Sequence, residues 1–461
     1  MRISTQQMHQ RAVELMQEQQ ARLVRTQGQL ASGKRFEVAS EDPAAAVRAM
    51  RLTREIAATE RYQVNAEAVR SRQVAEEGAL ASVTELLHAV RELVVQGNSD
   101  TLGAADRRAL AEVLGQRLDE LLALANTRDG TGEYLFAGFQ SGSRPFSRDA
   151  QGVVLYQGDQ GQRNLEIGPG VSVPMTDSGE AVFQRVRSGN GTFVTAADPA
   201  NTGSGAISAG QTTGPFTPGS YSLAFSQAAP DGPILYAVQD GGGNLVASGD
   251  YVSGAAIRFA GAEVTVTGTP ADGDRFSIEP SGNRDIFSIL QGAARALGEA
   301  ADDPAARAGL HTALDRGLVE LDGALEQVLL QRARVGGRLR LIEAQTGANE
   351  AFQAAATEAL SNAQDLDYAE AAARLQLQLV GLEAAQRSVL AIQGLTLFRL
   401  LGGFPSAAAP GRDPLVSFRL DPGSGVPSSA NEFAPTKGLQ RPEPAAHPSG
   451  CTPHPHPAQG P

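Results

Sequence analysis

The two ends of the chain carry the same kind of pattern, and the region between them does not. Residues 3–35 and 365–401 both repeat apolar side chains at steps of three and four, the spacing of one face of a helix. The stripe positions are Val13, Met16, Leu23 and Leu30 near the start, interrupted by Gln20 and Gln27, and Tyr368, Ala371, Leu375, Leu382, Ala385, Val389 and Ile392 near the end, interrupted by Gln378. A few heptads cannot hold a lone helix in water, so each stripe needs a partner. The pattern predicts that the two ends pair with each other or with other copies of the chain.

Composition argues against several classes of function. The formal net charge is −12 and no basic stripe stands out, whereas phosphate binding needs clustered Lys and Arg. No stretch approaches the roughly 18 uninterrupted apolar residues of a membrane span. Residues 1–30 also lack the apolar segment of a secretory signal. We therefore expect no nucleic-acid partner, no membrane insertion and no cleaved signal peptide.

Turn and cap signals divide the chain into parts. Ser40–Pro43 is typical of a helix start, Gly97–Thr101 of a break between helices, and Asp303 before Pro304 of a second capped start. The predicted parts are an N-terminal inner helix region (1–42), the first half of a helical domain (43–140), a β-rich outer insertion (141–284), the second half of the helical domain (285–363), a C-terminal inner helix (364–401) and a proline-rich disordered tail (402–461).

The insertion is predicted from a change of periodicity after Gly130. Short runs rich in β-branched and aromatic residues, bounded by Gly, Pro, Asp and Asn, predict strands at 133–139, 153–157, 220–225, 234–238 and 263–267. Residues 188–218 are almost all small or polar, which predicts long loops. Helical periodicity returns at Ile286 and includes a leucine stripe at Leu310, Leu314, Leu318, Leu321, Leu325 and Leu329. The fold class expected is mainly α, with an inserted β-rich domain and a long antiparallel helical or coiled-coil rod formed by the N- and C-terminal regions.

Residues that could hold phosphate do not form a convincing site. Gly28–Lys34 has the glycine and lysine spacing of a phosphate loop, but Arg35 stands where Ser or Thr would bind magnesium. A phosphate loop also follows a strand, and here a helix precedes it. We expect instead that a helix ends at Gly33 and the chain turns towards the next helix.

Candidate metal ligands are also few. The only cysteine, Cys451, lies near His454 and His456 in the proline-rich tail, and three ligands are fewer than an ordered zinc site usually needs. Asp272–Asp274 lacks the ligand pattern of a calcium loop, which favours a turn between strands. The other histidines are scattered, and no signature of a catalytic nucleophile is present. We expect no metal, no cofactor and no enzymatic activity.

Asp365 and Asp367 are predicted to help begin the C-terminal helix, where negative charge is favourable.

Motifs at both ends resemble the flagellin superfamily. They are Met1–Thr5, Leu30–Arg35 and Ser40–Ala45 at the start, and Asp365–Glu370 and Gln393–Leu401 at the end. Tyr134–Phe139, Pro145–Phe146, Gly273–Ile278 and Asp285–Phe287 are most similar to the branch of that superfamily that joins the flagellar hook to the filament.

The resemblance implies a structural role. Terminal helices would line an axial channel, the helices of 43–140 and 285–363 would form the next layer, and the insertion would point outward. Implied partners are other copies in a tubular ring, a neighbouring hook-associated protein, flagellin, and an export chaperone before secretion. The implied location is the extracellular flagellum, reached by type III export. Members of the family end at a position that corresponds to about Leu401 of this chain. We therefore expect residues 402–461 to be either a functional extension or the product of a frameshift, readthrough or gene-prediction error. Alternative functions are a filament flagellin or, less favoured, a coiled-coil surface or scaffold protein.

Overall fold

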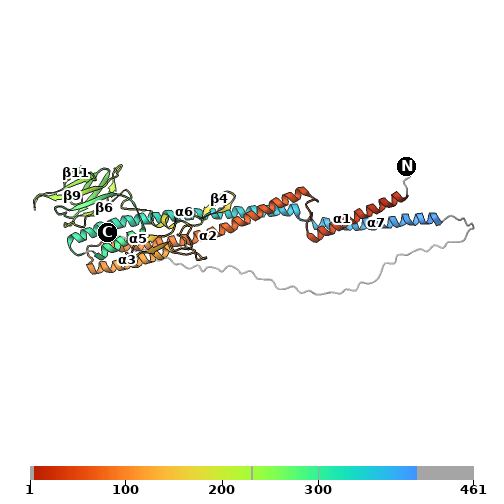
Figure 1. Ribbon diagram of the computed structural model, residues 1–461, viewed down its shortest axis with the longest axis horizontal. Helices are drawn as coiled ribbons and strands as arrows, with labels where there is room; N and C mark the ends of the chain where they lie inside the picture. The colour runs from red at the N-terminus through yellow and green to blue at the C-terminus, as the bar shows by residue number, and fades with distance from the viewer. Residues whose placement is uncertain (1–4, 230–231, 300, 402–461) are drawn as a thin grey trace, which may run out of the picture. The chain divides into compact units, whose positions relative to one another are not determined.

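The computed structural model describes residues 5–229, 232–299 and 301–401, and the proline-rich tail lies outside this part. The chain is mainly helical with an inserted β-rich region, as predicted (Figure 1). It divides into two units, 1–389 and 390–461. The helices are α1 (Thr5–Ser32), α2 (Pro43–Gly97), α3 (Ala104–Ala125), α4 (Gly179–Phe183), α5 (Ile286–Glu299), α6 (Pro304–Gln364) and α7 (Tyr368–Leu401).

The two longest helices begin where their cap signals predict. Asp42 precedes Pro43, and its carboxylate accepts the Ala45 N–H at 2.9 Å. Asp303 precedes Pro304 and accepts the Ala306 N–H at 2.9 Å in the same way. An acceptor at the N-cap satisfies an amide that has no partner within the helix, and proline tolerates the first turn. The predicted break is also confirmed, because α2 ends at Gly97 and α3 begins at Ala104.

Helices α2 and α6 pack side by side and run in opposite directions. Glu77 accepts from Arg332 at 2.7 Å, and Glu60 accepts from Gln353 at 3.4 Å, so rising numbers on α2 meet falling numbers on α6. The apolar side chains between them are fully buried at one end of the pair, where α3 and α5 complete the layer (Figure 1). This core includes Leu80, Val83, Leu87 and Val90 of α2 and Leu314, Leu321, Val328 and Val335 of α6.

The predicted leucine stripe on α6 is buried at Leu310, Leu314, Leu321 and Leu325, half-buried at Leu318 and wrong at its last position. Leu314 and Leu321 are fully buried, but Leu329 is 48% exposed and Val328 occupies the core position. At about 100° per residue, the eight residues from Leu321 to Leu329 turn the helix by about 80° more than two full turns. Leu329 therefore lies past the buried face.

The predicted strand at 133–139 is wrong. Most of these residues form turns, and Tyr134 makes only an isolated bridge to Arg128. Gly138 has a φ of +70°, which an extended strand does not allow. Leu135 and Phe136 are fully buried in the helical core, where Phe136 meets Phe183 at a ring-centroid distance of 5.3 Å. The run is apolar because it fills the core, so its composition resembles that of a strand.

Two sheets build most of the insertion. One five-stranded sheet has the order β11-β10-β9-β14-β6, and a second joins β12, β13, β7 and β8. The strands are β1 (Phe146–Arg148), β2 (Val154–Tyr156), β3 (Asn164–Gly168), β4 (Val171–Pro174), β5 (Val186–Arg187), β6 (Phe193–Ala197), β7 (Ala206–Ile207), β8 (Gln211–Thr212), β9 (Tyr221–Gln227), β10 (Ile234–Asp240), β11 (Leu245–Asp250), β12 (Ala256–Phe259), β13 (Ala262–Thr267), β14 (Arg275–Pro280) and β15 (Asn283–Arg284). Their pairings are antiparallel, and the predicted strands near 154, 221, 234 and 263 are confirmed.

The long loops predicted for 188–218 are only partly present. The segment contributes β6, β7 and β8, which pair with the distant strands β14 and β13. Phe193 and Ile207 are buried in the sheet core. A short strand of mostly small residues gains its stability from such distant partners, and local composition does not reveal them.

Buried polar groups attach the insertion to the helices. Glu320 of α6 is 1% exposed, accepts the Gly189 N–H at 3.2 Å and pairs with Arg284 at 2.7 Å. Further along, Arg338 of α6 binds both carboxylate oxygens of Asp177, at 2.8 and 2.9 Å. Charged hydrogen bonds of this kind are directional, so they fix the position of the loops that lead into and out of the sheets.

Glu76 of α2 is the most strongly perturbed member of this buried network. Its side chain is fully buried, one oxygen accepts the Asp177 N–H at 3.1 Å, and the other accepts from Gln73 at 3.3 Å. Burial, helped by the charge of Asp177, raises the pKa of Glu76 to about 8. The folded protein therefore holds this carboxyl in its protonated form at neutral pH.

We expect Glu76→Gln to change how stability depends on pH. A carboxyl whose pKa rises on folding contributes its full stability below the unfolded pKa of about 4.3, and this contribution is lost as pH rises towards about 8. The variant should therefore unfold at a higher temperature than the parent chain at pH 8 and above, by roughly 2–4 °C per kcal/mol gained. Thermal unfolding followed by circular dichroism from pH 4 to 9 measures this. Glu85→Gln, at an exposed site on the same helix, is the control. If the difference in unfolding temperature from the parent chain is independent of pH for both variants, the expectation is wrong.

Candidate assembly interface

A short connector joins the terminal helices to the long helices. Helix α1 ends at Ser32, and Gly33 turns the chain with a φ of +70°. The Arg35 N–H then donates to the Gln364 carbonyl at 2.8 Å, and the Leu366 N–H donates to the Gly33 carbonyl at 2.9 Å. These two bonds tie the end of α1 to the step between α6 and α7. The helix end predicted at Gly33 is confirmed.

Side chains complete this connector. Asp42, which caps α2, also accepts from Arg35 at 2.9 Å, and Gln29 donates to the Arg35 carbonyl at 2.6 Å. Asp367 begins α7 by accepting the N–H groups of Ala369 and Glu370, at 2.9 and 3.1 Å. The prediction that Asp367 helps begin the C-terminal helix is therefore confirmed. Asp365 instead ends α6, and its backbone forms an isolated antiparallel β-bridge with that of Lys34 across the connector.

The predicted stripe residues are mostly half-buried. Tyr368 is the exception at 57% exposed, and the side chain of Ile392 lies outside the described part of the structure. The half-buried positions are Val13, Met16, Leu23 and Leu30 on α1 and Leu375, Leu382 and Val389 on α7. The structure brings the two helices close at Gly381, where an added Cβ would lie 3.4 Å from the Gln19 side chain.

The polar interruptions of the α1 stripe are not the predicted ones. Gln20 and Gln27 are exposed, whereas Gln19 and Thr26 point to the less exposed side. The Thr26 hydroxyl donates to its own helix at the Arg22 carbonyl, 3.1 Å away, so it needs no other partner when covered. Steps of three and four residues along α1 can pass through either Gln20 and Gln27 or Gln19 and Thr26. Only packing selects between these two patterns.

Apolar side chains also point away from the seam. Leu377 is 74% exposed and Val380 64% exposed on α7, and on α1 Leu15 and Val24 are exposed to a similar degree. A helix with apolar residues on several sides is normally covered on several sides. The pair of terminal helices therefore presents surface suited to further helices.

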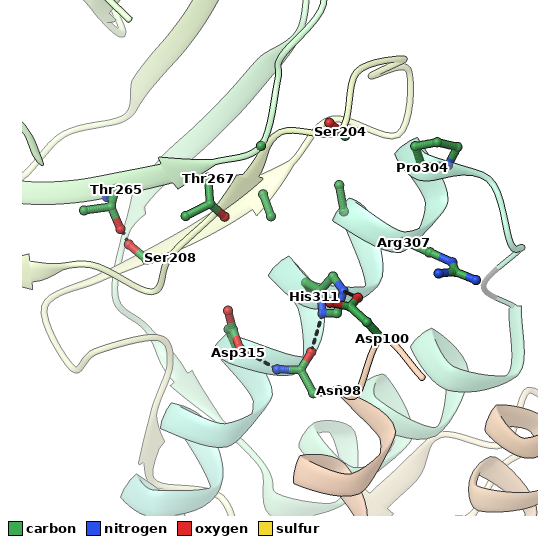
Figure 2. A pocket seen from close by; sticks show the side chains of 13 residues that line it. Asn98, Asp100, Ser204, Ser208, Thr265, Thr267, Pro304, Arg307, His311 and Asp315 are labelled. Carbon is green, nitrogen blue, oxygen red and sulfur yellow. Dashed lines mark hydrogen bonds and ion pairs between the residues drawn. The ribbon is translucent and has the colours of Figure 1, made fainter. Parts of the chain in front are cut away.

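A polar cleft of about 710 Å³ contains His311. Figure 2 shows His311 of α6 facing Asn98 and Asp100, which follow the end of α2. Its Nδ1 lies 2.7 Å from Asn98 Oδ1 and its Nε2 lies 2.8 Å from Asp100 Oδ1, while Asn98 donates to Asp315 at 2.9 Å. Both ring nitrogens are thus engaged by the turn after α2. The contacts brace this turn against α6, a role that the scattered histidines of the sequence did not reveal.

Other candidate sites are accounted for by local structure. Asp274 is 2% exposed and accepts backbone N–H groups from Thr202, Gly203 and Ala271, so it holds a turn. Among the described residues, no group of three or more His, Cys, Asp or Glu side chains is arranged to hold a metal ion. Cys451, His454 and His456 lie outside them. No helix in that same part is long and apolar enough to cross a membrane.

Comparison with known proteins decides the family. The family model for the bacterial flagellin N-terminal helical region matches residues 3–141. A solved structure of FlgL from Xanthomonas campestris is 36% identical, with a TM-score of 0.58, and the match covers 62% of this chain and 93% of that chain. The flagellar junction protein FlgL from Legionella pneumophila is 30% identical, with a TM-score of 0.63, over 69% of this chain and 99% of that chain. The chain belongs to the flagellar hook-associated protein 3 family.

A curated member of the family is similar over a shorter span. Flagellar hook-associated protein 3 of Escherichia coli K12 is 31% identical over 188 residues, which is 41% of this chain and 58% of that protein. The chain thus aligns with little more than half the length of this curated relative. Membership in the hook-associated protein 3 family agrees with the superfamily resemblance of the terminal motifs.

Gly33→Ala should loosen the connector. A side chain at a φ of +70° costs about 1–2 kcal/mol, and the new Cβ would also lie 2.7 Å from the Tyr368 hydroxyl. We expect hydrogen exchange in peptides covering 29–42 and 361–371 to become roughly 5- to 30-fold faster. Gly78→Ala in α2, where an added Cβ meets nothing within 4 Å, is the control and should not change exchange at the connector. Unchanged protection in Gly33→Ala would show that the connector does not depend on this turn.

Proposed function

We propose that this chain is a structural subunit of the bacterial flagellum that joins the hook to the filament. The observation that carries the proposal is the exposed apolar surface of α1 and α7, in a chain that belongs to the hook-associated protein 3 family. Burying one Leu or Val side chain contributes about 1.5–3 kcal/mol. Contacts of this kind, repeated around a closed ring, are strong enough to hold an assembly together.

The proposed arrangement follows the layers of the chain. The terminal helices form the inner wall of a tube, and a rod of antiparallel helices including α2 and α6 forms the next layer. The insertion faces outward. Neighbouring copies complete the ring, with a second hook-associated protein on one side and flagellin on the other. The subunit leaves the cell by the flagellar export route without a cleaved signal, and a chaperone holds its C-terminal helix beforehand.

The filament flagellin alternative is less well supported. Solved structures of FlgL and of a flagellar hook-associated protein-3 are 30–36% identical to this chain. A non-flagellar scaffold would share the heptads but not this family. We infer no catalytic role, because the relatives named above are structural parts of the flagellum by their names.

Deletion of the gene tests the role directly. If the chain joins hook to filament, cells without it should keep their hooks, lose attached filaments and release flagellin into the medium. Electron microscopy of the cells and immunoblotting of the medium measure both effects. Filaments of normal number on the deletion strain would reject the junction role.

Leu382→Asp should abolish incorporation without unfolding the rest of the chain. Leu382 is half-buried on the seam of α7, and a carboxylate there would have to be buried without a partner. We expect a loss of attached filaments of at least about tenfold, which corresponds to 1.4 kcal/mol or more per contact. Leu245→Asp, at a 61% exposed position on β11, is the matched control and should assemble normally. Normal filaments with Leu382→Asp would show that the seam is assigned incorrectly.

A further inference from the structure

Helix α2 carries a second heptad row that none of the described residues covers. The row starts near the beginning of α2 and takes alternating steps of three and four residues. It consists of Val47, Met50, Arg54, Ala57, Arg61 and Val64, which are all exposed, and we call it the outer row. Val47 is 68% exposed and Val64 71% exposed. Regular spacing of this kind marks one continuous face of a helix.

The outer row is distinct from the face that packs on α6. The inner face of the same stretch is marked by the buried residues Ala45, Ala49, Thr59 and Ala66. Counting at 3.6 residues per turn places the outer row on the opposite side of the helix. The intramolecular pairing with α6 therefore leaves a complete seam free, with two arginines in its middle.

Helix α6 presents a matching groove on its exposed surface. The groove is lined by Glu350, Ala354, Thr357 and Glu358 together with neighbouring polar residues. The small Ala354 lies between the two glutamates along the helix, and Ser361 lies beyond Glu358, so an apolar position is flanked by two acidic ones. We call this the acidic groove.

The charges of the two surfaces correspond in spacing. Arg54 and Arg61 are seven residues apart on α2, about 10.5 Å, and Glu350 and Glu358 are eight residues apart on α6, about 12 Å. Within the described residues, none of these four side chains forms a salt bridge, although nearby Arg51 pairs with Glu55. Long arginine side chains easily span the remaining difference.

The two surfaces also lie at the same height in each molecule. The contacts of Glu60 with Gln353 and of Glu77 with Arg332 fix the antiparallel register of α2 and α6. Counting between these contacts puts Arg61 within about two residues, or ~3 Å, of the height of Glu350. The same count places Arg54 level with Glu358. Two copies side by side, without an axial shift, would therefore bring the outer row of one against the acidic groove of the next.

We propose that the outer row of α2 docks into the acidic groove of α6 on a second copy of this chain. In this contact Arg61 faces Glu350, Ala57 packs over Ala354, and Arg54 faces Glu358. The apolar members of the row contribute most of the favourable burial, whereas exposed ion pairs add little energy and mainly fix register and partner. The contact rests on the proposed function, because it supplies the lateral interface of the proposed ring.

Disulfide trapping tests the contact in assembled flagella. Arg61→Cys and Glu350→Cys are combined in a chain whose only native cysteine is replaced, Cys451→Ser. We expect oxidation of purified flagella to give dimers and higher multimers of this chain, whereas a bond within one chain would leave a monomer. Glu67→Cys with Glu350→Cys is the control, because Glu67 is exposed on α2 but outside the row. Monomers alone, or bonding to another flagellar protein carrying a cysteine, would overturn the proposal.

Charge reversal gives a second test with an internal rescue. Arg54→Glu with Arg61→Glu, or Glu350→Arg with Glu358→Arg, should each reduce attached filaments at least tenfold, because like charges meet. All four changes in one chain should restore attachment, since every contact again joins opposite charges. Unfolding of each purified variant, followed by circular dichroism, separates this effect from misfolding. If the chain with all four changes gives no more attached filaments than either double variant, the proposed lateral contact is wrong.

The junction role and the contact between the outer row and the acidic groove can be rejected separately. A deletion strain that sheds filaments, together with charge variants that rescue it fully, would leave the junction role intact and reject only this contact. A deletion strain with normal filaments would reject the junction role itself.

Discussion

The antiparallel pairing of α2 with α6 is the contact on which the rest of the structure depends. The two helices come from opposite sides of the insertion in sequence, and their apolar faces are buried against each other and against α3 and α5. Because this pair closes a very long stretch of chain, its burial must offset a large loss of chain entropy.

The polar groups of α6 show how one helix holds several parts in place. Glu320 fixes the loop that enters the large sheet, Arg338 fixes the loop after β4 through Asp177, and His311 braces the turn after α2. Buried charges are costly unless paired, so each of these contacts has one geometry that satisfies it. These polar contacts add fixed geometry to the apolar packing of the insertion on the helices, to which Phe183 and Val173 belong.

Much of the helical framework could be predicted, since the signals for it are local. The cap at Asp42 with Pro43, the cap at Asp303 with Pro304 and the glycine turn at Gly33 each depend on residues adjacent in sequence. Errors arose where a choice depended on packing. Apolar composition at 133–139 suited a strand equally well, and the stripe of α1 had two registers that differ by a single residue. The role of His311 required α6 and the turn after α2 to be placed together.

The sequence by itself determined that two amphipathic ends flank a β-rich region, that the long helices start at capped prolines, and that the terminal motifs resemble flagellin. Each depends on periodicity or on neighbouring residues. Only the tertiary structure decided which faces remain exposed. Val47, Arg61 and Glu350 become candidates for contact between copies because α2 and α6 use their other faces on each other, and that allocation exists only after the chain has folded.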